Sequence, residues 1–341
     1  MCEVIVKNIL VTGSAGFIGF HLTLHLLQMG LKVTGVDALT DYYDVELKKK
    51  RLSILQEYSS YQHTTIRLED KKKLLSVCEE SQAEVIVHLA AQAGVRYSID
   101  HPNEYLDTNI TGTFNILECA RITRVKHLLM ASTSSVYGAN TSLPFDESQH
   151  TDNPLTFYAA TKKCGEIMAH SYSHLFELPI TVFRFFTVYG PWGRPDMALF
   201  KFTQCILNGD PIDIYNGGEM YRDFTYVADL TQAIILLLER IPRRTLENDY
   251  DENASSVAPF RIVNIGNSEK VKLMDFIEAI EDSLHMKAKK NYLPMQQGDV
   301  PATWADCTLL KNLTGYQPQT HYSDGILEFV NWYREFYFHS I

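Results

Sequence analysis

The stretch ILVTGSAGFIGF, residues 9–20, places three glycines between an apolar run and a helical pattern. Gly13, Gly16 and Gly19 would let the chain turn tightly, bring backbone N–H groups close to a pyrophosphate and let the next helix pack against a sheet. Their spacing is G-x-x-G-x-x-G rather than the commoner G-x-G-x-x-G. A glycine triplet alone can be only a packing device. The surrounding strand-turn-helix pattern favours a dinucleotide-binding site.

The next predicted strand, KVTGVDAL (32–39), supports a dinucleotide site because it ends near an acid. Asp37 lies at the distance expected for the carboxylate that accepts hydrogen bonds from an adenosine ribose. Its charge would repel a 2′-phosphate, so we expect NAD rather than NADP as the cofactor. The alternative is an Asp that only forms the following turn. Asp70, after the third predicted strand, is either an adenine contact or an exposed loop acid.

Short apolar runs alternate with helical patterns through the first half of the chain, which predicts an α/β fold with a doubly wound parallel (Rossmann) sheet. Runs such as EVIVHLA are apolar nearly throughout, as expected for strands covered on both faces. The helical pattern from Phe17 ends naturally at Gly30. The predicted strands are residues 8–12, 32–37, 64–68, 84–90, 126–132 and 180–187.

The regular alternation ends after residue 190, which indicates two domains. We expect an NAD-binding domain over 1–190 and a smaller C-terminal α/β domain over 191–341. Residues 225–241 and about 261–267 have the pattern of elements that return to the first domain. The polar, acidic segment 243–259 predicts an exposed insertion.

Composition limits the classes of function. The formal net charge of -10 argues against a general nucleic-acid or anionic-membrane binder. The longest apolar stretch, AIILLL (233–238), is too short to span a bilayer, and no signal-peptide pattern is visible. Six dispersed cysteines form no C-x-x-C pair, so we expect reduced thiols, no metal site and a cytoplasmic protein.

A second motif, YAATK, places Tyr158 and Lys162 one turn apart on a predicted helix. It follows the fifth predicted strand, whose end reads ASTSSVYG and carries Thr133, Ser134 and Ser135. Ligands of doubly wound sheets bind outside the carboxyl ends of the strands, so these side chains are expected at a binding site. The alternative is an ordinary surface Tyr–Lys pair.

Oxidation of a sugar hydroxyl by NAD needs a base, and the tyrosine and lysine of this motif can provide one. A free phenol has a pKa of about 10, too high for a base near neutrality. A lysine ammonium and an oxidised nicotinamide nearby would both lower it. Tyr158 could then take a proton from a sugar hydroxyl while the attached carbon gives its hydride to NAD. The Thr133 hydroxyl could hold the same oxygen.

The motifs TGxxGxxG, a Ser/Thr cluster before VYG, and YxxxK, in that order, resemble the extended short-chain dehydrogenase/reductase family, which includes nucleotide-sugar epimerases and dehydratases. The resemblance covers nearly the whole chain and includes HLAAQAGVR (88–96), YRDFTYVADL (221–230), VNIGN (263–267) and QQGDV (296–300). Within that family, AAQAGVRYS, YAATKK and RFFTVYGPWGRPDMALFKFT (184–203) are similar to the UDP-glucuronate 4-epimerases.

The resemblance implies a role for each matching residue. Tyr158 would be the base, Lys162 would lower its pKa and hold the nicotinamide ribose, and Thr133 would share the substrate hydroxyl. Arg222 would pair with the diphosphate of a UDP-sugar and Asp299 would hold the uridine ribose. The cofactor contacts would be Gly13, Gly16, Phe17, Ile18, Gly19, Asp37, Asp70, Ala90 and Ala91, together with Tyr158 and Lys162.

Two departures from common family patterns concern the substrate. Many galactose epimerases have Arg three residues before the acid where this chain has Gln296, which leaves more of the diphosphate charge to Arg222. Many sugar epimerases have Asn at the position of Thr187. A hydroxyl there, with Ser134, Ser135 and Arg194, could cradle a carboxylate. Alternatively Thr187 only satisfies backbone at a strand end and Arg194 only lies on the surface.

The predicted function is interconversion of UDP-glucuronate and UDP-galacturonate by NAD-dependent C4 oxidation, rotation of the 4-keto sugar and re-reduction. The triplet Thr133-Ser134-Ser135 lacks the carboxylic acids that sugar dehydratases and xylose-forming decarboxylases carry there. Alternatives are epimerisation of another UDP-hexose or UDP-N-acetylhexosamine, a net dehydrogenase, and a non-catalytic NAD-binding protein. The resemblance also implies a homodimer formed through the helix of Tyr158 and its neighbour.

Overall fold

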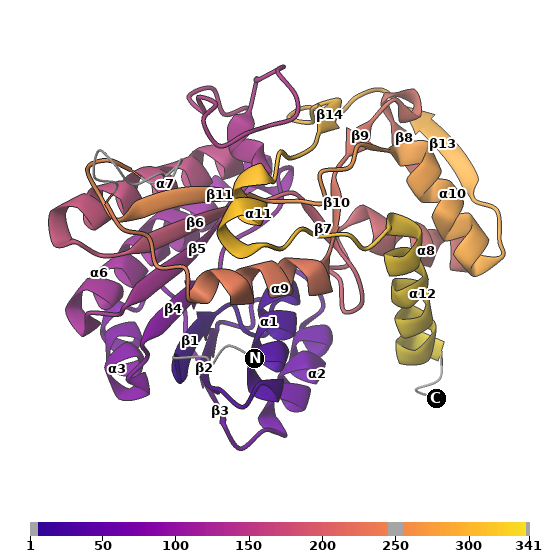
Figure 1. The fold of residues 1–341 in the computed structure, drawn as a ribbon. Coiled ribbons are helices and arrows are strands. Elements are labelled where there is room, and N and C mark those ends of the chain that lie inside the picture. Colours follow the sequence, from indigo (N-terminus) through magenta and orange to yellow (C-terminus); the bar gives the residue numbers. More distant parts are fainter. Residues whose placement is uncertain (1–5, 245–254, 339–341) are drawn as a thin grey trace.

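The computed structural model describes residues 6–244 and 255–338. Its centre is a seven-stranded sheet in which all neighbouring strands run parallel (Figure 1). The strands lie in the order β11-β6-β5-β4-β1-β2-β3. Their bounds are β1 Asn8–Thr12, β2 Lys32–Asp37, β3 Tyr61–Thr65, β4 Val85–His88, β5 His127–Thr133, β6 Ile180–Phe185 and β11 Phe260–Ile265. The predicted doubly wound α/β fold is confirmed.

The direction of winding reverses between β1 and β4. The chain runs from β1 outward through β2 to β3, then returns to the other side of β1 and continues through β4, β5 and β6. In such sheets a crevice opens outside the carboxyl ends of the strands where the order reverses. The turn after Thr12, the end of β4 and the end of β5 all lie at this edge.

Two apolar clusters cover the sheet, one on each face. Ile9 and Val11 of β1 join one cluster, whereas Leu10 between them joins the other, because successive side chains of a strand point to opposite faces. The first cluster includes side chains of α1 (Phe17–Gln28) and α9 (Val227–Leu238). The second includes side chains of α3 (Lys71–Ser81), α6 (Thr113–Thr123) and α7 (Phe157–Phe176). The central strands are therefore apolar on both faces.

Two predicted strands differ from the structure. β3 covers 61–65 rather than 64–68, since its sequence YQHTT is mostly polar at the sheet edge and Tyr61 is its only buried residue. The run 180–187 is interrupted at Phe186. β6 stays in the large sheet, while β7 (Thr187–Tyr189) pairs with β10 (Phe224–Tyr226). An apolar pattern cannot reveal this change of partner.

A third apolar cluster forms the smaller part of the molecule. It contains side chains of α8 (Ala198–Asn208), α10 (Leu273–Leu284) and α12 (Tyr322–Phe338), and Figure 1 shows these helices to one side of the sheet. Two small sheets complete this part. β8 (Pro211–Tyr215) runs parallel to β13 (Lys289–Leu293), and β9 (Tyr221–Arg222) lies between β12 (Val271–Lys272) and β14 (Ala302–Thr303).

We propose a domain boundary near residue 190, with two later elements returning to the first domain. The third apolar cluster begins at Tyr189 and contains no residue from the preceding chain. α9 packs against α1, and β11 pairs with β6 at the edge of the large sheet. Of the predicted insertion 243–259, residues 245–254 lie outside the described residues.

Two fully buried histidines make stability depend on pH. Burial lowers the pKa of His88 and of His127 to about 3, and each ring contacts protein oxygens, including Thr12 at 2.8 Å and Thr181 at 2.9 Å. The unfolded chain binds a proton at a pKa of about 6.5. Each histidine therefore contributes stability that is present above pH ~6.5 and is lost as pH falls toward the folded pKa.

We expect the free energy of unfolding to fall by up to about 1.4 kcal/mol per pH unit for each of these histidines as the pH drops from ~6.5 toward 4.5. Denaturant titrations at several pH values measure this slope. His127→Gln, which removes one buried imidazole, should flatten it, whereas His285→Gln at an exposed site should not. Equal slopes for the protein and His127→Gln would contradict the prediction.

Candidate active site

A cavity of about 270 Å³ opens at the carboxyl ends of the central strands. It is lined by parts of the glycine-rich turn, the end of β2, the end of β4 and the helix α7. Of the predicted cofactor residues it brings together Gly13, Gly16, Phe17, Ile18, Gly19, Asp37, Ala90, Ala91, Tyr158 and Lys162. Thr133 also lines it.

The glycine turn has no room for side chains at two positions. A Cβ atom on Gly19 would lie 1.9 Å from the Gly13 carbonyl oxygen, so α1 could not begin where it does. Gly13 has a φ of +74°, and a Cβ there would lie 2.8 Å from the Ala90 backbone nitrogen. The spacing of the glycines is therefore required by the close approach of the turn to α1 and to the end of β4.

Asp37 both shapes the turn and lines the cavity. Its Oδ2 accepts a hydrogen bond from the Ala15 N–H at 3.0 Å, and its Oδ1 accepts one from the Leu39 N–H at 2.8 Å. The two alternatives considered for this residue are thus compatible: the carboxylate orders the backbone and still faces the cofactor cavity.

Asp70 does not line this cavity. It is the N-cap of α3, where its Oδ1 accepts a hydrogen bond from the Lys73 N–H at 3.2 Å and its carboxylate pairs with the Lys73 ammonium. At this end the cavity is lined by Arg67, Leu68 and Glu69 instead. The adenine contact predicted for Asp70 has no support in this geometry, because a capping carboxylate points at the helix backbone.

The helix α7 presents Tyr158 and Lys162 to the cavity. It begins at an N-cap, Thr156, whose hydroxyl accepts a hydrogen bond from the Ala159 N–H at 3.2 Å. Two turns later Glu166 accepts a hydrogen bond from the Ser132 hydroxyl of β5 at 2.7 Å. This buried contact fixes α7 against the strand that ends at Thr133, and so fixes the tyrosine beside the threonine.

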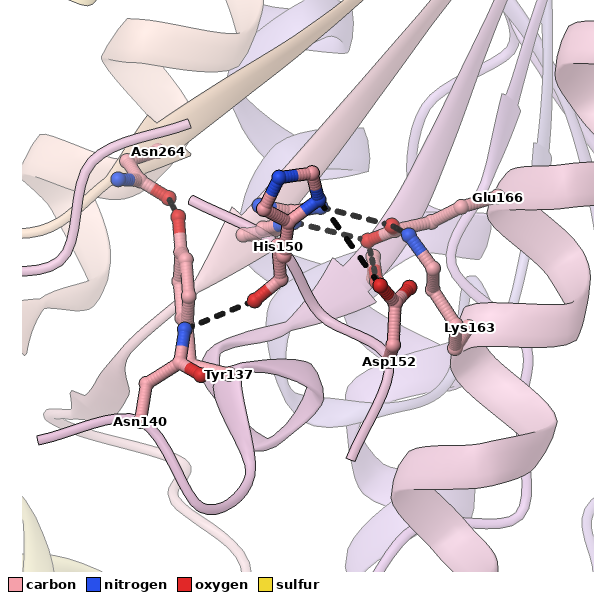
Figure 2. Close-up of polar contacts among 9 residues, drawn as sticks. Tyr137, Asn140, His150, Asp152, Lys163, Glu166 and Asn264 are labelled. Carbon is pink, nitrogen blue, oxygen red and sulfur yellow. Dashed lines mark hydrogen bonds and ion pairs between the residues drawn. The ribbon is translucent and has the colours of Figure 1, made fainter. Parts of the chain in front are cut away.

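Figure 2 shows how the surroundings of Glu166 are organised. Lys163 donates to Glu166 Oε2 at 3.3 Å from the same helix. Nearby, the Tyr137 hydroxyl donates to Asn264 Oδ1 of β11 at 2.7 Å, and the Asn140 side chain donates to the His150 carbonyl oxygen at 2.8 Å. The Tyr137 contact ties the segment between β5 and α7 to β11, and the Asn140 contact joins two parts of that segment.

Electrostatics at the tyrosine differ in part from the expectation. Burial raises the pKa of Tyr158, and the groups that oppose this rise are the Thr133 hydroxyl and the positive charge of Arg194. Lys162 is not among them. Burial lowers the pKa of Lys162 itself to about 8, although Glu166 opposes that shift. The sequence analysis expected a lysine ammonium and an oxidised nicotinamide to lower the pKa of this phenol, whereas among the protein groups Thr133 and Arg194 lower it.

A second, larger cavity of about 860 Å³ adjoins the first. It lies between the ends of the sheet strands and the smaller part of the molecule. All the predicted substrate residues line it, namely Ser134, Ser135, Thr187, Arg194, Arg222 and Asp299. Thr133, Tyr158 and Arg194 line both cavities, so the tyrosine stands where they meet.

The hydroxyl triplet forms a short turn at the end of β5. The Thr133 hydroxyl donates to the Ser135 hydroxyl at 3.2 Å and accepts from the Ser135 N–H at 3.2 Å. A 3₁₀ turn from Ser134 to Tyr137 follows. The three residues line the larger cavity with hydroxyl groups and contribute no carboxylic acid to it.

Arg96 is a residue whose role the sequence analysis did not assign. Its guanidinium donates to Asp299 Oδ2 at 3.1 Å and lies over the Tyr215 ring, 4.9 Å from its centre. Arg222 is nearby: burial lowers its pKa, Asp299 raises it, and the positive charge of Arg96 lowers it. Arg96 lies in HLAAQAGVR, one of the stretches that carry the family resemblance, so the sequence did mark this position. The sequence could not reveal its contact with Asp299, which is 203 residues away.

The larger cavity thus brings the guanidinium groups of Arg96 and Arg222 close to the carboxylate of Asp299. Arg96, Arg222 and Asp299 all line it, while Gln296 does not. Asp100 and Asp213 also line this cavity, so its lining carries charges of both signs. The guanidinium groups of Arg96 and Arg222 offer N–H donors in a geometry that suits an anionic ligand such as a phosphate.

Arg194 has an acidic partner that the sequence analysis did not assign. Asp196, two residues later, binds both Nε and Nη2 of the guanidinium, with 3.0 Å between Nε and Oδ1. The Tyr42 hydroxyl donates to the same carboxylate at 3.2 Å. The R-P-D spacing could have suggested the ion pair, but the contribution of Tyr42 depends on the fold.

The described residues contain neither a metal-binding cluster nor a membrane-spanning helix. Within 6–244 and 255–338, no group of three or more His, Cys, Asp or Glu side chains could hold a metal ion. No helix in the same residues is long and apolar enough to cross a bilayer.

Comparison with known proteins points to one family. The model of the NAD dependent epimerase/dehydratase family matches residues 9–251. A probable UDP-glucuronate 4-epimerase of Rhizobium meliloti (strain 1021) is 51% identical, covering 96% of this chain and 97% of that protein. UDP-glucuronate 4-epimerase 1 of Arabidopsis thaliana is 42% identical, covering 97% and 77%. The UDP-glucuronic acid 4-epimerase from Bacillus cereus, solved with UDP-glucuronic acid and NAD, has a TM-score of 0.85 at 33% identity, covering 96% and 99%.

Proposed function

We propose that this chain, which belongs to the NAD dependent epimerase/dehydratase family, interconverts UDP-glucuronate and UDP-galacturonate. The reaction oxidises C4, lets the 4-keto sugar rotate and reduces C4 again from its other face. The observation that carries the proposal is the meeting of the two cavities at Tyr158, Thr133 and Arg194. With NAD in the smaller cavity and the acidic sugar in the larger one, all three residues would lie near C4 of the sugar. Tyr158 would act there as the base, Thr133 as a hydroxyl donor and Arg194 as a cation.

The smaller cavity fits NAD. A side chain at Gly13 or Gly19 would collide with backbone, so the turn stays close to the sheet. The residues 17–19 at the start of α1 and Asp37 at the end of β2 line the cavity. These groups would hold the pyrophosphate and the adenosine ribose, and Lys162 would hold the nicotinamide ribose. When bound, NAD supplies the hydride acceptor and donor for C4.

Tyr158 is proposed to move the proton of the C4 hydroxyl. In the forward half it takes that proton as the C4–H bond breaks and a carbonyl forms, and in the return half it gives the proton back. Thr133 holds the same oxygen and lowers the pKa of the phenol, as does Arg194. The positive charge of Lys162 is available to the nicotinamide side of the site.

The sugar carboxylate is proposed to bind Ser134, Ser135, Thr187 and Arg194. A 4-keto uronate is a β-keto acid, which loses CO2 when its carboxylate bond aligns with the carbonyl π system. Several hydroxyl donors and one guanidinium can hold the carboxylate out of that alignment. The absence of a carboxylic acid at Ser134 and Ser135 supports epimerisation over dehydration.

The UDP portion is proposed to bind at the distal end of the larger cavity. Arg222 and Arg96 would share the diphosphate, which offsets the neutral Gln296 in the chain. Asp299 would hold the uridine ribose. Arg96 is already oriented by Asp299 and the Tyr215 ring, so its guanidinium is partly ordered before the nucleotide binds.

An epimerisation assay tests the function. Purified protein is incubated without added cofactor with UDP-glucuronate, UDP-glucose or UDP-N-acetylglucosamine, and C4 inversion is followed by NMR. We expect product from UDP-glucuronate and no consumption of added NAD. Product only from a neutral sugar would favour another UDP-hexose epimerase. No product from any of them, despite bound NAD, would favour a non-catalytic protein.

We also propose a homodimer formed through α6 and α7. These neighbouring helices expose large apolar side chains: Phe114 and Ile122 on α6, and Phe157, Ile167, Leu175 and Phe176 on α7. Burying such a face in a partner copy removes apolar area from water. We expect a dimer mass by light scattering and a shift toward monomer for Ile167→Asp. A monomer at all concentrations would contradict this.

A cytoplasmic location is proposed as well. All five cysteines among the described residues are free thiols, as expected for a reducing compartment. The proposed substrate is a small nucleotide sugar, and the formal net charge of -10 gives no support for nucleic acid as a partner.

A further inference from the structure

Arg194 is held on one edge by a carboxylate of its own loop. Asp196 binds the Nε and Nη2 groups of the guanidinium, and the two side chains are 26% and 21% exposed, respectively. Burial raises the pKa of Asp196, but the positive charge and hydrogen bonds of Arg194 lower it by more. The carboxylate is therefore charged at neutral pH. The pair is therefore a charged, two-pronged contact rather than a loose surface ion pair.

Tyr42 fixes the carboxylate in turn. Its hydroxyl donates to Asp196 Oδ2 at 3.2 Å, and the Arg194 guanidinium carbon lies 5.9 Å from the centre of its ring. Burial, followed by the Asp196 charge, raises the pKa of Tyr42 to about 12, which keeps the phenol protonated as a donor. Tyr42 lies between β2 and α2 (Val45–Gln56), so the first domain holds a loop that follows β7.

The contact leaves part of the guanidinium for a ligand. A guanidinium has five N–H donors, and Asp196 engages only Nε and Nη2. Among residues 6–244 and 255–338, none accepts a hydrogen bond from Nη1 within bonding distance. The Nη1–Nη2 edge can bind a second carboxylate in the same two-pronged manner. Tyr42, Arg194 and Asp196 all line the larger cavity.

We propose that Asp196, held by Tyr42, positions the Arg194 guanidinium so that its remaining edge meets the carboxylate of a uronate. Asp196 is thus a positioning residue that makes the site selective for acidic over neutral UDP-sugars. This inference rests on the proposed function. The alternative is competition: the Asp196 carboxylate would bind the Arg194 guanidinium only until the substrate carboxylate displaced Asp196.

The two models predict opposite effects of removing the charge. If Asp196 positions Arg194, Asp196→Asn leaves the guanidinium mobile, and binding of the uronate becomes weaker. If Asp196 competes, the same substitution frees the guanidinium and binding becomes tighter. A neutral UDP-glucose has no carboxylate for Arg194, so its affinity should change little in either model.

Calorimetric dissociation constants for UDP-glucuronate and UDP-glucose, together with the rate of CO2 release during turnover, test the proposal. We expect Asp196→Asn to weaken UDP-glucuronate binding at least 10-fold, to change UDP-glucose binding less than 3-fold and to increase CO2 release per epimerisation event. Tyr42→Phe, which removes one hydroxyl, should act in the same direction by about 2- to 10-fold. Exposed Asp210→Asn is the matched control and should change none of these quantities.

A double-mutant cycle separates positioning from a general structural role. In an Arg194→Ala background, Asp196→Asn should have no further effect on UDP-glucuronate binding, since it acts through the arginine. Tighter binding in Asp196→Asn, equal losses for both sugars, or an undiminished effect without Arg194 would overturn the inference. Should Asp196→Asn not fold, Tyr42→Phe alone decides the direction. If the unaltered protein inverts UDP-glucuronate and these variants keep its selectivity, only this inference fails and the proposed function stands.

Discussion

Tyr158→Phe is expected to lower kcat for UDP-glucuronate epimerisation about 10²- to 10⁴-fold, the range typical for loss of a general acid–base group. Phe keeps the ring but cannot accept or return the C4 proton. The hydroxyl acts mainly in the transition state, so KM should change far less than kcat. Initial rates of C4 inversion, followed by NMR, provide the measurement.

The substitution should leave the cofactor site intact. The amount of NAD bound per chain is the check, because the glycine turn and Asp37 do not depend on the phenol hydroxyl. Tyr292→Phe, at an exposed position in β13, serves as a control with the same chemical change. Unchanged turnover in Tyr158→Phe would remove the basis of the proposed mechanism.

Glu166→Ala is expected to lower the free energy of unfolding by about 3–5 kcal/mol, the usual cost of breaking a buried ion pair from one side. Glu166 and Arg184 have side chains that are each 2% exposed, and two hydrogen bonds of 3.0 and 2.9 Å join them. Alanine would leave the arginine charge buried without its carboxylate. Ser132 would also lose its acceptor.

Denaturant unfolding measures this loss. The control is Glu177→Ala, which removes the partner of Arg244 in an exposed pair and should cost less than about 1 kcal/mol. If both variants lost a similar amount of unfolding free energy, the prediction that the buried ion pair stabilises the fold more than the exposed pair would be wrong. Glu166 also raises the pKa of Lys162, so the variant should hold less positive charge on that lysine near neutrality.

Several parts of the site could be predicted because they depend on local spacing. The three glycines lie within seven consecutive residues, 13–19, and Tyr158 and Lys162 are one helical turn apart. The apolar strands β1, β4 and β5 are covered on both faces, so their composition is distinctive. The polar edge strand β3 lacked that signal and was placed three residues too late.

Other expectations meet contacts that motif spacing and apolar patterns do not reveal. Asp70 has the sequence position of a cofactor contact, but the Lys73 N–H, three residues later at the start of α3, donates to its carboxylate. The run from Ile180 to Thr187 looks continuous, but its last residue pairs with β10 outside the large sheet. In both cases a hydrogen-bond partner that the pattern does not indicate takes the group concerned.

The amino-acid sequence by itself determined the parallel sheet, the glycine turn and the helix that carries Tyr158 and Lys162. Only the tertiary structure brought Arg96 to Asp299 and Tyr42 to Asp196, across separations of 203 and 154 residues. Apolar periodicity and close-packed glycines act within one element, so they can be recognised along the chain. The position of a charge in a cavity depends on which distant elements converge there, and that is settled only when the cores have packed.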